Sequence, residues 1–118
     1  MRQGNVVREK SLAFAVRVVR FSQYLQEEKK EFVMSKQVLR SGTAIGALVR
    51  EAGQGESRAD FVHKLAIALK EAAETDYWLE VLHETRYLET AAFESLRRDL
   101  TELIKLLTSI IKTSRTGM

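Results

Sequence analysis

Proline and cysteine are both missing from this chain of 118 residues. Without proline, nothing in the sequence forces a helix to end or kink. A content of 45% hydrophobic and 30% charged residues then favours long helices over a turn-rich β fold. Without cysteine, the chain has no disulfides, no thiolate metal sites and no thiol nucleophiles.

Long hydrophobic runs are also missing. No apolar stretch reaches the ~18 residues that a membrane span requires. The apolar stretch 12–21 near the start is interrupted by Arg17 and Arg20, which argues against a secretory signal. We therefore expect a soluble, cytoplasmic protein.

Charge of either sign is close to balanced. The chain has 19 basic and 16 acidic residues, for a net charge of +3. Strong nucleic-acid binders show a concentrated basic cluster rather than a small surplus. The charge balance therefore permits nucleic-acid binding without demanding it.

Apolar residues recur every three or four positions in four segments, the spacing of a helix that buries one face. We expect helices to start after Asn5 (or Ser11), Ser35, Ser57 and Thr90. Four helices with short connections predict an all-α, antiparallel up-and-down four-helix bundle. The bundle forms one domain over 1–118, with residues 1–4 and 114–118 frayed. The expected core stripes are Phe14, Val18, Phe21 and Leu25; Val38, Gly42 (or Ser41), Ile45, Val49 and Ala52; Phe61, Leu65, Ala68, Ala72, Thr75, Leu79 and Leu82; and Phe93, Leu96, Leu100, Leu103, Leu107 and Ile110. Leu12, Ala15 and Val19 are expected to widen the first stripe.

The second of these helices is unusually rich in small residues. Gly42 and Gly46 lie inside it, and each glycine costs roughly 1 kcal/mol relative to alanine. A helix that bears this cost usually needs its backbone close to another helix. We expect tight packing along this segment.

Apolar side chains exceed what one buried seam per helix requires. We interpret the surplus as a surface for self-association and expect a homo-oligomer. The surplus consists of Ile67, Trp78, Ile104 and Ile111, together with the small-residue face of the second helix. The expected interface residues are Ala44, Ala47, Ile67 and Trp78.

Several motifs together resemble one known family, the four-helix-bundle proteins encoded in intervening sequences of bacterial 23S ribosomal RNA genes. The most specific is the second-helix segment Leu-Arg-Ser-Gly-Thr-Ala-Ile-Gly-Ala at 39–47. The others are Lys10-Ser11 with Phe14-Ala15, Glu51-Ala52, Asp60-Phe61, Leu65-x-Ile67-Ala68, Glu74 and Tyr77-Trp78-Leu79.

This resemblance implies an up-and-down bundle that assembles into a ring, typically a homopentamer. It also implies a distant relation to the accessory bundle protein of diversity-generating retroelements, which binds nucleic acid and a reverse transcriptase. No biochemical activity comes with it.

Arg40, Glu51 and Glu74 match charged positions of the family motif. They could hold an RNA phosphate or a partner peptide. The alternative is an ion-pair network between the second and third helices, or between subunits, because charges beside a small-residue contact usually set orientation. We favour the network.

Lys10, Arg17, Arg20 and Tyr24 are predicted to share the outer side of the first helix. A basic stripe with an aromatic residue is what a phosphate-tracking surface presents. The alternative is that the stripe faces the acidic third helix of a neighbouring subunit. On the fourth helix, Arg98, Lys105 and Lys112 lie one turn from Glu94 and Glu102, which predicts a salt-bridged solvent face.

Two weaker patterns concern catalysis and metals. Arg58-x4-His63 fits the spacing of HEPN-type ribonucleases, helical bundles that cleave RNA as dimers. Glu80-x-x-His83 resembles half of a di-iron site, but such sites need these pairs on two helices. We expect no metal, cofactor or small-molecule substrate.

The leading hypothesis is a non-enzymatic, ring-forming scaffold that contacts nucleic acid through its basic residues. The alternatives are an RNA-cleaving bundle that uses Arg58 and His63, and a protein–protein adaptor without nucleic-acid contact.

Overall fold

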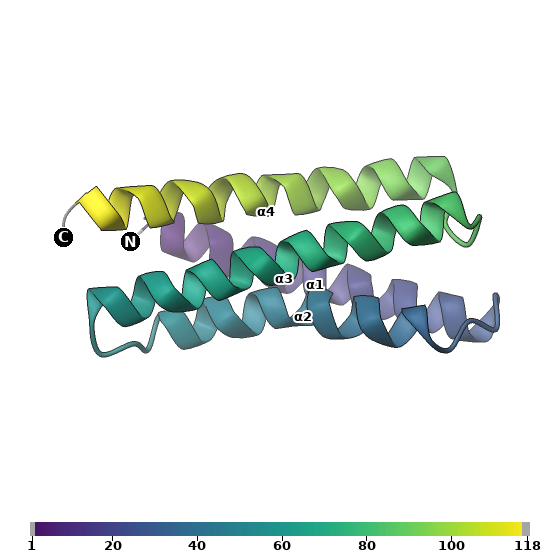
Figure 1. The fold of residues 1–118 in the computed structure, drawn as a ribbon, viewed down its shortest axis with the longest axis horizontal. Helices are drawn as coiled ribbons and strands as arrows, with labels where there is room; N and C mark the ends of the chain where they lie inside the picture. The colour runs from purple at the N-terminus through teal and green to yellow at the C-terminus, as the bar shows by residue number, and fades with distance from the viewer. Residues whose placement is uncertain (1, 117–118) are drawn as a thin grey trace.

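The computed structural model describes residues 2–116, which fold into four antiparallel helices packed as one bundle. The start of the first helix and the end of the fourth lie at the same end of the bundle as the loop between the second and third helices (Figure 1). The bundle measures 47 × 21 × 19 Å. Its helices are α1 (Arg2–Glu27), α2 (Met34–Ala52), α3 (Arg58–Glu84) and α4 (Thr90–Thr116).

One apolar stripe from each helix forms the common core. Each helix packs on the next in sequence, and α1 meets α4 to close the bundle. The predicted stripes are confirmed, except that Val62 is buried where the pattern predicts Phe61, which is only half-buried. The largest fully buried side chains include Phe14, Leu25, Ile45, Leu65, Leu79, Leu82, Leu100, Leu103, Leu107 and Ile110.

Several helix ends differ from the prediction. α1 begins at Arg2, before either expected cap, and ends at Glu27. α4 includes Thr90 itself and continues to Thr116, so residues 2–4 and 114–116 are helical rather than frayed. The rest of that prediction falls on residues 1, 117 and 118, outside the described residues. Ser57 caps α3 as predicted, with its hydroxyl accepting from the backbone N–H of Asp60 at 3.0 Å.

The start of α2 is capped by an acidic side chain and not by Ser35. The carboxylate of Glu31 accepts the backbone N–H groups of Val33, Met34 and Ser35 at 2.9, 3.0 and 2.9 Å. These are among the N–H groups that a helix start leaves without a partner inside the helix, and a negative charge there is favourable. Ser35 is buried within the helix, where its carbonyl accepts from the Ser22 hydroxyl at 3.1 Å.

The small residues of α2 bring it close to α1. A Cβ atom at Gly42 would lie 2.8 Å from both Cγ atoms of Val18, and one at Gly46 would lie 3.4 Å from the backbone oxygen of Ser11. The expected tight contact is therefore present, and the two glycines make it. Ala47 is not part of it, because its side chain is exposed on the outer side of α2.

Gly42→Ala is expected to lower the free energy of unfolding by about 1–2 kcal/mol. Val18 is fully buried and has no room to yield, so the overlap costs about 1–3 kcal/mol. Better helix propensity returns at most about 1 kcal/mol. Urea unfolding followed by circular dichroism measures the change.

Gly53→Ala is the matched control. A Cβ there would lie 3.5 Å from its nearest neighbour, the backbone oxygen of Arg50, an ordinary contact. Its φ of −65° suits alanine. This variant should be neutral or slightly more stable. Equal effects at the two glycines would show that the approach to Val18 is unimportant.

Candidate nucleic-acid interface

A groove between α1 and α4 brings together three of the four residues predicted to contact nucleic acid. Arg17, Arg20 and Tyr24 of α1 line a cavity of about 520 Å³. The side chain of Tyr24 is 40% exposed. The groove lies toward the end of the bundle that carries the α3–α4 turn.

Tyr87 supplies a second tyrosine to this groove from the α3–α4 turn. The backbone N–H of Tyr87 donates to the carbonyl of Leu82 at 2.9 Å, and the preceding Arg86 has a positive φ of 67°. From sequence, residues 87–89 predict only a turn. An aromatic residue in a short turn between amphipathic helices is the signal that could have identified this residue.

The basic stripe on α1 is largely neutralised by α4 of the same chain. Arg17 binds the carboxylate of Asp99 at 2.7 Å and the backbone oxygen of Ser95 at 3.3 Å. Lys10 pairs with Glu102, and this hydrogen bond raises the pKa of Lys10. Glu102 therefore faces α1, whereas the sequence pattern pairs it with basic residues of α4.

Arg20 differs from these two cations. It is exposed, and no acidic side chain within residues 2–116 pairs with it. The groove thus offers two tyrosines and the guanidinium group of Arg20, unpaired among the described residues, while the guanidinium group of Arg17 is already bound to Asp99. This combination suits a phosphate beside a stacked base.

The Arg40 network joins α2 to α3. The guanidinium group of Arg40 binds Glu71 at 2.7 Å and Glu74 at 2.6 Å. The indole N–H of Trp78 donates to the same oxygen of Glu74 at 3.2 Å. The structure therefore brings Arg40 and Glu74 together and adds Glu71, whereas Glu51 is exposed and makes no side-chain ion pair in the described part of the chain.

These contacts shift two pKa values in opposite directions. Hydrogen bonds from Arg40 first, and from Trp78 second, lower the pKa of Glu74, and hydrogen bonds to Glu71 and Glu74 raise that of Arg40. Beneath the network, the hydroxyl of Thr75 donates to that of Ser41 at 2.9 Å in the buried α2–α3 contact. The cluster is a satisfied polar network.

The expected oligomer interface is only partly accessible. Ala44, Ile67 and Trp78 are half-buried on the α2–α3 flank, and Ala47 is exposed. Of the other surplus residues, Ile104 packs against the core, and Ile111 is buried.

The most exposed apolar stripe lies on α1 instead. Leu12, Val16 and Val19 are 50%, 43% and 38% exposed. Their spacing of four and three places them on one side of the helix. The sequence pattern predicts that Leu12 and Val19 widen the core stripe. The structure corrects this, because α2 and α4 cover only the inner face of α1.

The residues of the catalytic and metal patterns are dispersed or otherwise engaged. Arg58 and His63 are five positions apart on α3, about 140° around the helix axis, and so face different directions. Glu80 binds Arg97 at 2.6 Å, and His83 stacks on Phe93 with ring centroids 4.3 Å apart. No helix within residues 2–116 is long and apolar enough to cross a membrane.

Replacing Arg40 with glutamine should raise the midpoint of an acid titration observed at Trp78. The pKa of Glu74 is lowered in the fold, so its contribution to stability is present above the unfolded-state pKa of about 4.3 and is lost as pH falls through the lower folded value. Without Arg40, the carboxylate should take up its proton at higher pH. The indole N–H signal of this single tryptophan reports the step by NMR.

Arg97→Gln is the control, because Arg97 binds Asp76 and Glu80 and does not contact Glu74. It should leave the Trp78 midpoint unchanged. An identical midpoint with and without Arg40 would contradict the proposed coupling. Circular dichroism at each pH establishes that the bundle remains folded.

Comparison with known proteins agrees with this fold. A solved protein of unknown function from the S23 ribosomal protein family of Bacteroides thetaiotaomicron VPI-5482 is 61% identical in sequence, with a TM-score of 0.93. The match covers 93% of this chain and 98% of that one. None of the curated proteins matches the chain. The model of the 23S rRNA-intervening sequence proteins matches residues 3–109, and the chain belongs to this family.

Proposed function

We propose that this protein is a non-enzymatic, self-associating cytoplasmic scaffold that contacts single-stranded nucleic acid through the α1–α4 groove. The observation that carries the nucleic-acid contact is the meeting of Arg20, Tyr24 and Tyr87 around one open groove. Phosphate contacts supply affinity that depends on salt, and base stacking on aromatic side chains supplies affinity that does not depend on sequence.

The chemistry of the groove favours a single strand over a duplex. Tyrosine rings can stack only on bases that are not already stacked in a helix. Glu89, the acidic residue that lines the groove, can accept from a base amino group. The family is described by its link to 23S rRNA, which favours RNA over DNA as the natural strand.

Two groove variants should separate the phosphate and base contributions. Arg20→Gln should weaken binding to single-stranded RNA and reduce the slope of log K against log salt by about 0.7, the value for one phosphate contact. Tyr24→Ala should cost about 1–3 kcal/mol of binding free energy and leave the slope unchanged. Fluorescence anisotropy across a salt series measures both quantities.

Arg98→Gln is the matched control, because it removes an exposed cation outside the groove. It should change neither affinity nor slope. Equal losses of RNA affinity for Arg20→Gln and Arg98→Gln would show that the binding is nonspecific charge attraction and not contact in the groove. Absent binding to RNA would leave the protein–protein adaptor as the better description.

Self-association rests on a separate observation, the exposed Leu12, Val16 and Val19 stripe. Contiguous exposed apolar residues mark interaction surfaces more often than scattered ones do. We propose that this stripe packs on the α2–α3 flank around Ala47, Ile67 and Trp78 of a second copy. When two different faces of identical subunits bind each other, the contact repeats from copy to copy and forms a ring if the rotation between copies closes. The family resemblance implies a ring of five copies.

Val16→Glu should reduce the oligomer mass measured by light scattering, because it places a charge in the middle of the stripe. Ala47→Glu should do the same from the other face while the melting temperature of the isolated subunit is preserved, since Ala47 is exposed. Ala73→Glu is the control, because Ala73 is exposed on α3 and lies outside the proposed interface; this variant should keep the wild-type mass. A monomeric wild type, or unchanged mass in both interface variants, would contradict the ring.

A further inference from the structure

A second cavity lies at the opposite end of the bundle from the α1–α4 groove. It has a volume of about 410 Å³ and is formed by the start of α1, the end of α2, the start of α3 and the end of α4. This volume is within the usual range for small-molecule pockets, about 300–1,000 Å³. Neither the resemblance nor the α1–α4 groove accounts for it.

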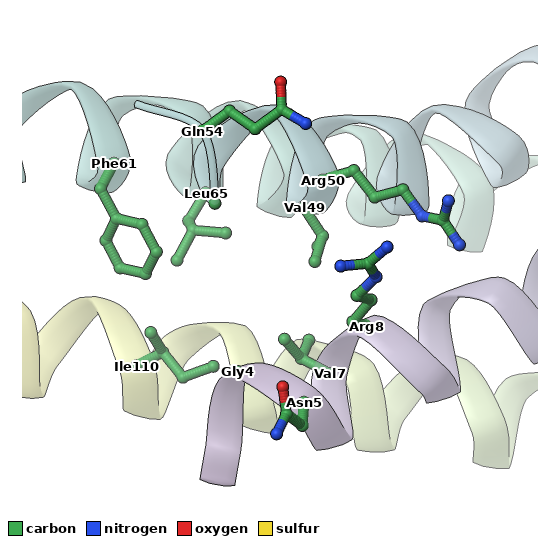
Figure 2. A pocket seen from close by; sticks show the side chains of 11 residues that line it. Gly4, Asn5, Val7, Arg8, Val49, Arg50, Gln54, Phe61, Leu65 and Ile110 are labelled. Carbon is green, nitrogen blue, oxygen red and sulfur yellow. The ribbon is translucent and has the colours of Figure 1, made fainter. Parts of the chain in front are cut away.

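The cavity has an apolar side and a basic side (Figure 2). Phe61, Leu65 and Ile110 lie on one side, and the guanidinium groups of Arg8 and Arg50 lie on the other. Val7 and Val49 are buried between them. A ligand that fills the cavity must therefore combine an apolar body with an anionic group.

Phe61 contributes an aromatic ring to the cavity and is not fully buried in the core. The helical pattern predicts it in the α3 core stripe, but Val62 occupies that place and Phe61 remains half-buried. Its ring projects into the cavity (Figure 2), where it offers a face or edge to a flat partner. Gly4 and Gly53 also line the cavity.

The two arginines, Arg8 and Arg50, make the cavity positively charged. Neither pairs with an acidic side chain within residues 2–116, and none of the residues that line the cavity is acidic. The start of α1 and the end of α2 contribute partial charges of opposite sign here, which oppose each other. Arg50 lies in the last turn of α2, where a cation is favourable, but this does not account for Arg8 on the same cavity.

Two guanidinium groups match a phosphate monoester better than a carboxylate. A phosphate monoester carries close to two negative charges at neutral pH and presents several acceptor oxygens to the guanidinium forks. Asn5 and Gln54 also line the cavity, and an amide side chain can donate to or accept from the edge of a heterocycle.

We propose that this cavity binds a nucleoside monophosphate, with the base against Phe61 and the aliphatic wall and the phosphate between Arg8 and Arg50. The site is separate from the α1–α4 groove, so it can be present or absent independently of RNA binding.

Calorimetric titration of the full chain with adenosine 5′-monophosphate tests this proposal, with adenosine and inorganic phosphate as separate probes. The monophosphate should bind saturably, with a Kd below about 1 mM, and each fragment should bind at least about tenfold more weakly. Equal binding of inorganic phosphate would overturn the apolar half of the site, and equal binding of adenosine would overturn the arginine half. No saturable binding of the monophosphate would overturn the proposal.

Variants place the ligand in the cavity. Arg8→Gln and Arg50→Gln should each weaken monophosphate binding about tenfold, the usual loss for a charge-assisted hydrogen bond. Both side chains are exposed, so the fold should survive, which the melting temperature checks. Arg98→Gln and the groove variant Tyr24→Ala should leave monophosphate binding unchanged. Loss of monophosphate binding in Tyr24→Ala with none in Arg8→Gln would place the ligand in the groove and contradict the proposed site.

Discussion

The contact between α1 and α2 at Gly42 is the constraint on which the rest of the structure depends. Val18 occupies the space that a side chain at position 42 would need, and the backbone of Ser11 faces Gly46 in the same way. α1 forms one wall of the groove with α4 and one wall of the cavity with α2. The depth to which α1 settles on α2 therefore sets the width of both proposed sites.

Ion pairs bridge the other three contacts between neighbouring helices. Arg40 with Glu71 and Glu74 joins α2 to α3, Arg97 with Asp76 and Glu80 joins α3 to α4, and Lys10 and Arg17 with Glu102 and Asp99 join α1 to α4. Between α1 and α2, residues 2–116 provide no such pair. The side chains are partly exposed, so each pair adds little stability and mainly sets orientation. Arg8, Arg20 and Arg50 remain outside these pairs.

The fold was predictable from sequence because the stripe from Phe14 to Leu25 and its counterparts repeat with the helical period. Residues beside the core stripes were less predictable, because periodicity gives the angle of a side chain around its helix but not whether a neighbouring helix covers that side chain. The pattern therefore predicts Leu12 and Val19 beside the core stripe, and both are exposed in the structure. Ion-pair partners such as Lys10 and Glu102 lie far apart in the chain, and the cap by Glu31 depends on how its loop turns back.

A double-mutant cycle on Val18 and Gly42 tests the central claim most directly. Val18→Ala removes the methyl groups that a Cβ at position 42 would meet. Gly42→Ala should therefore cost less in that background, with an interaction energy of about 1 kcal/mol or more measured by urea unfolding. If the two effects add to within about 0.5 kcal/mol, the close approach at Gly42 does not position α1, and the account is wrong.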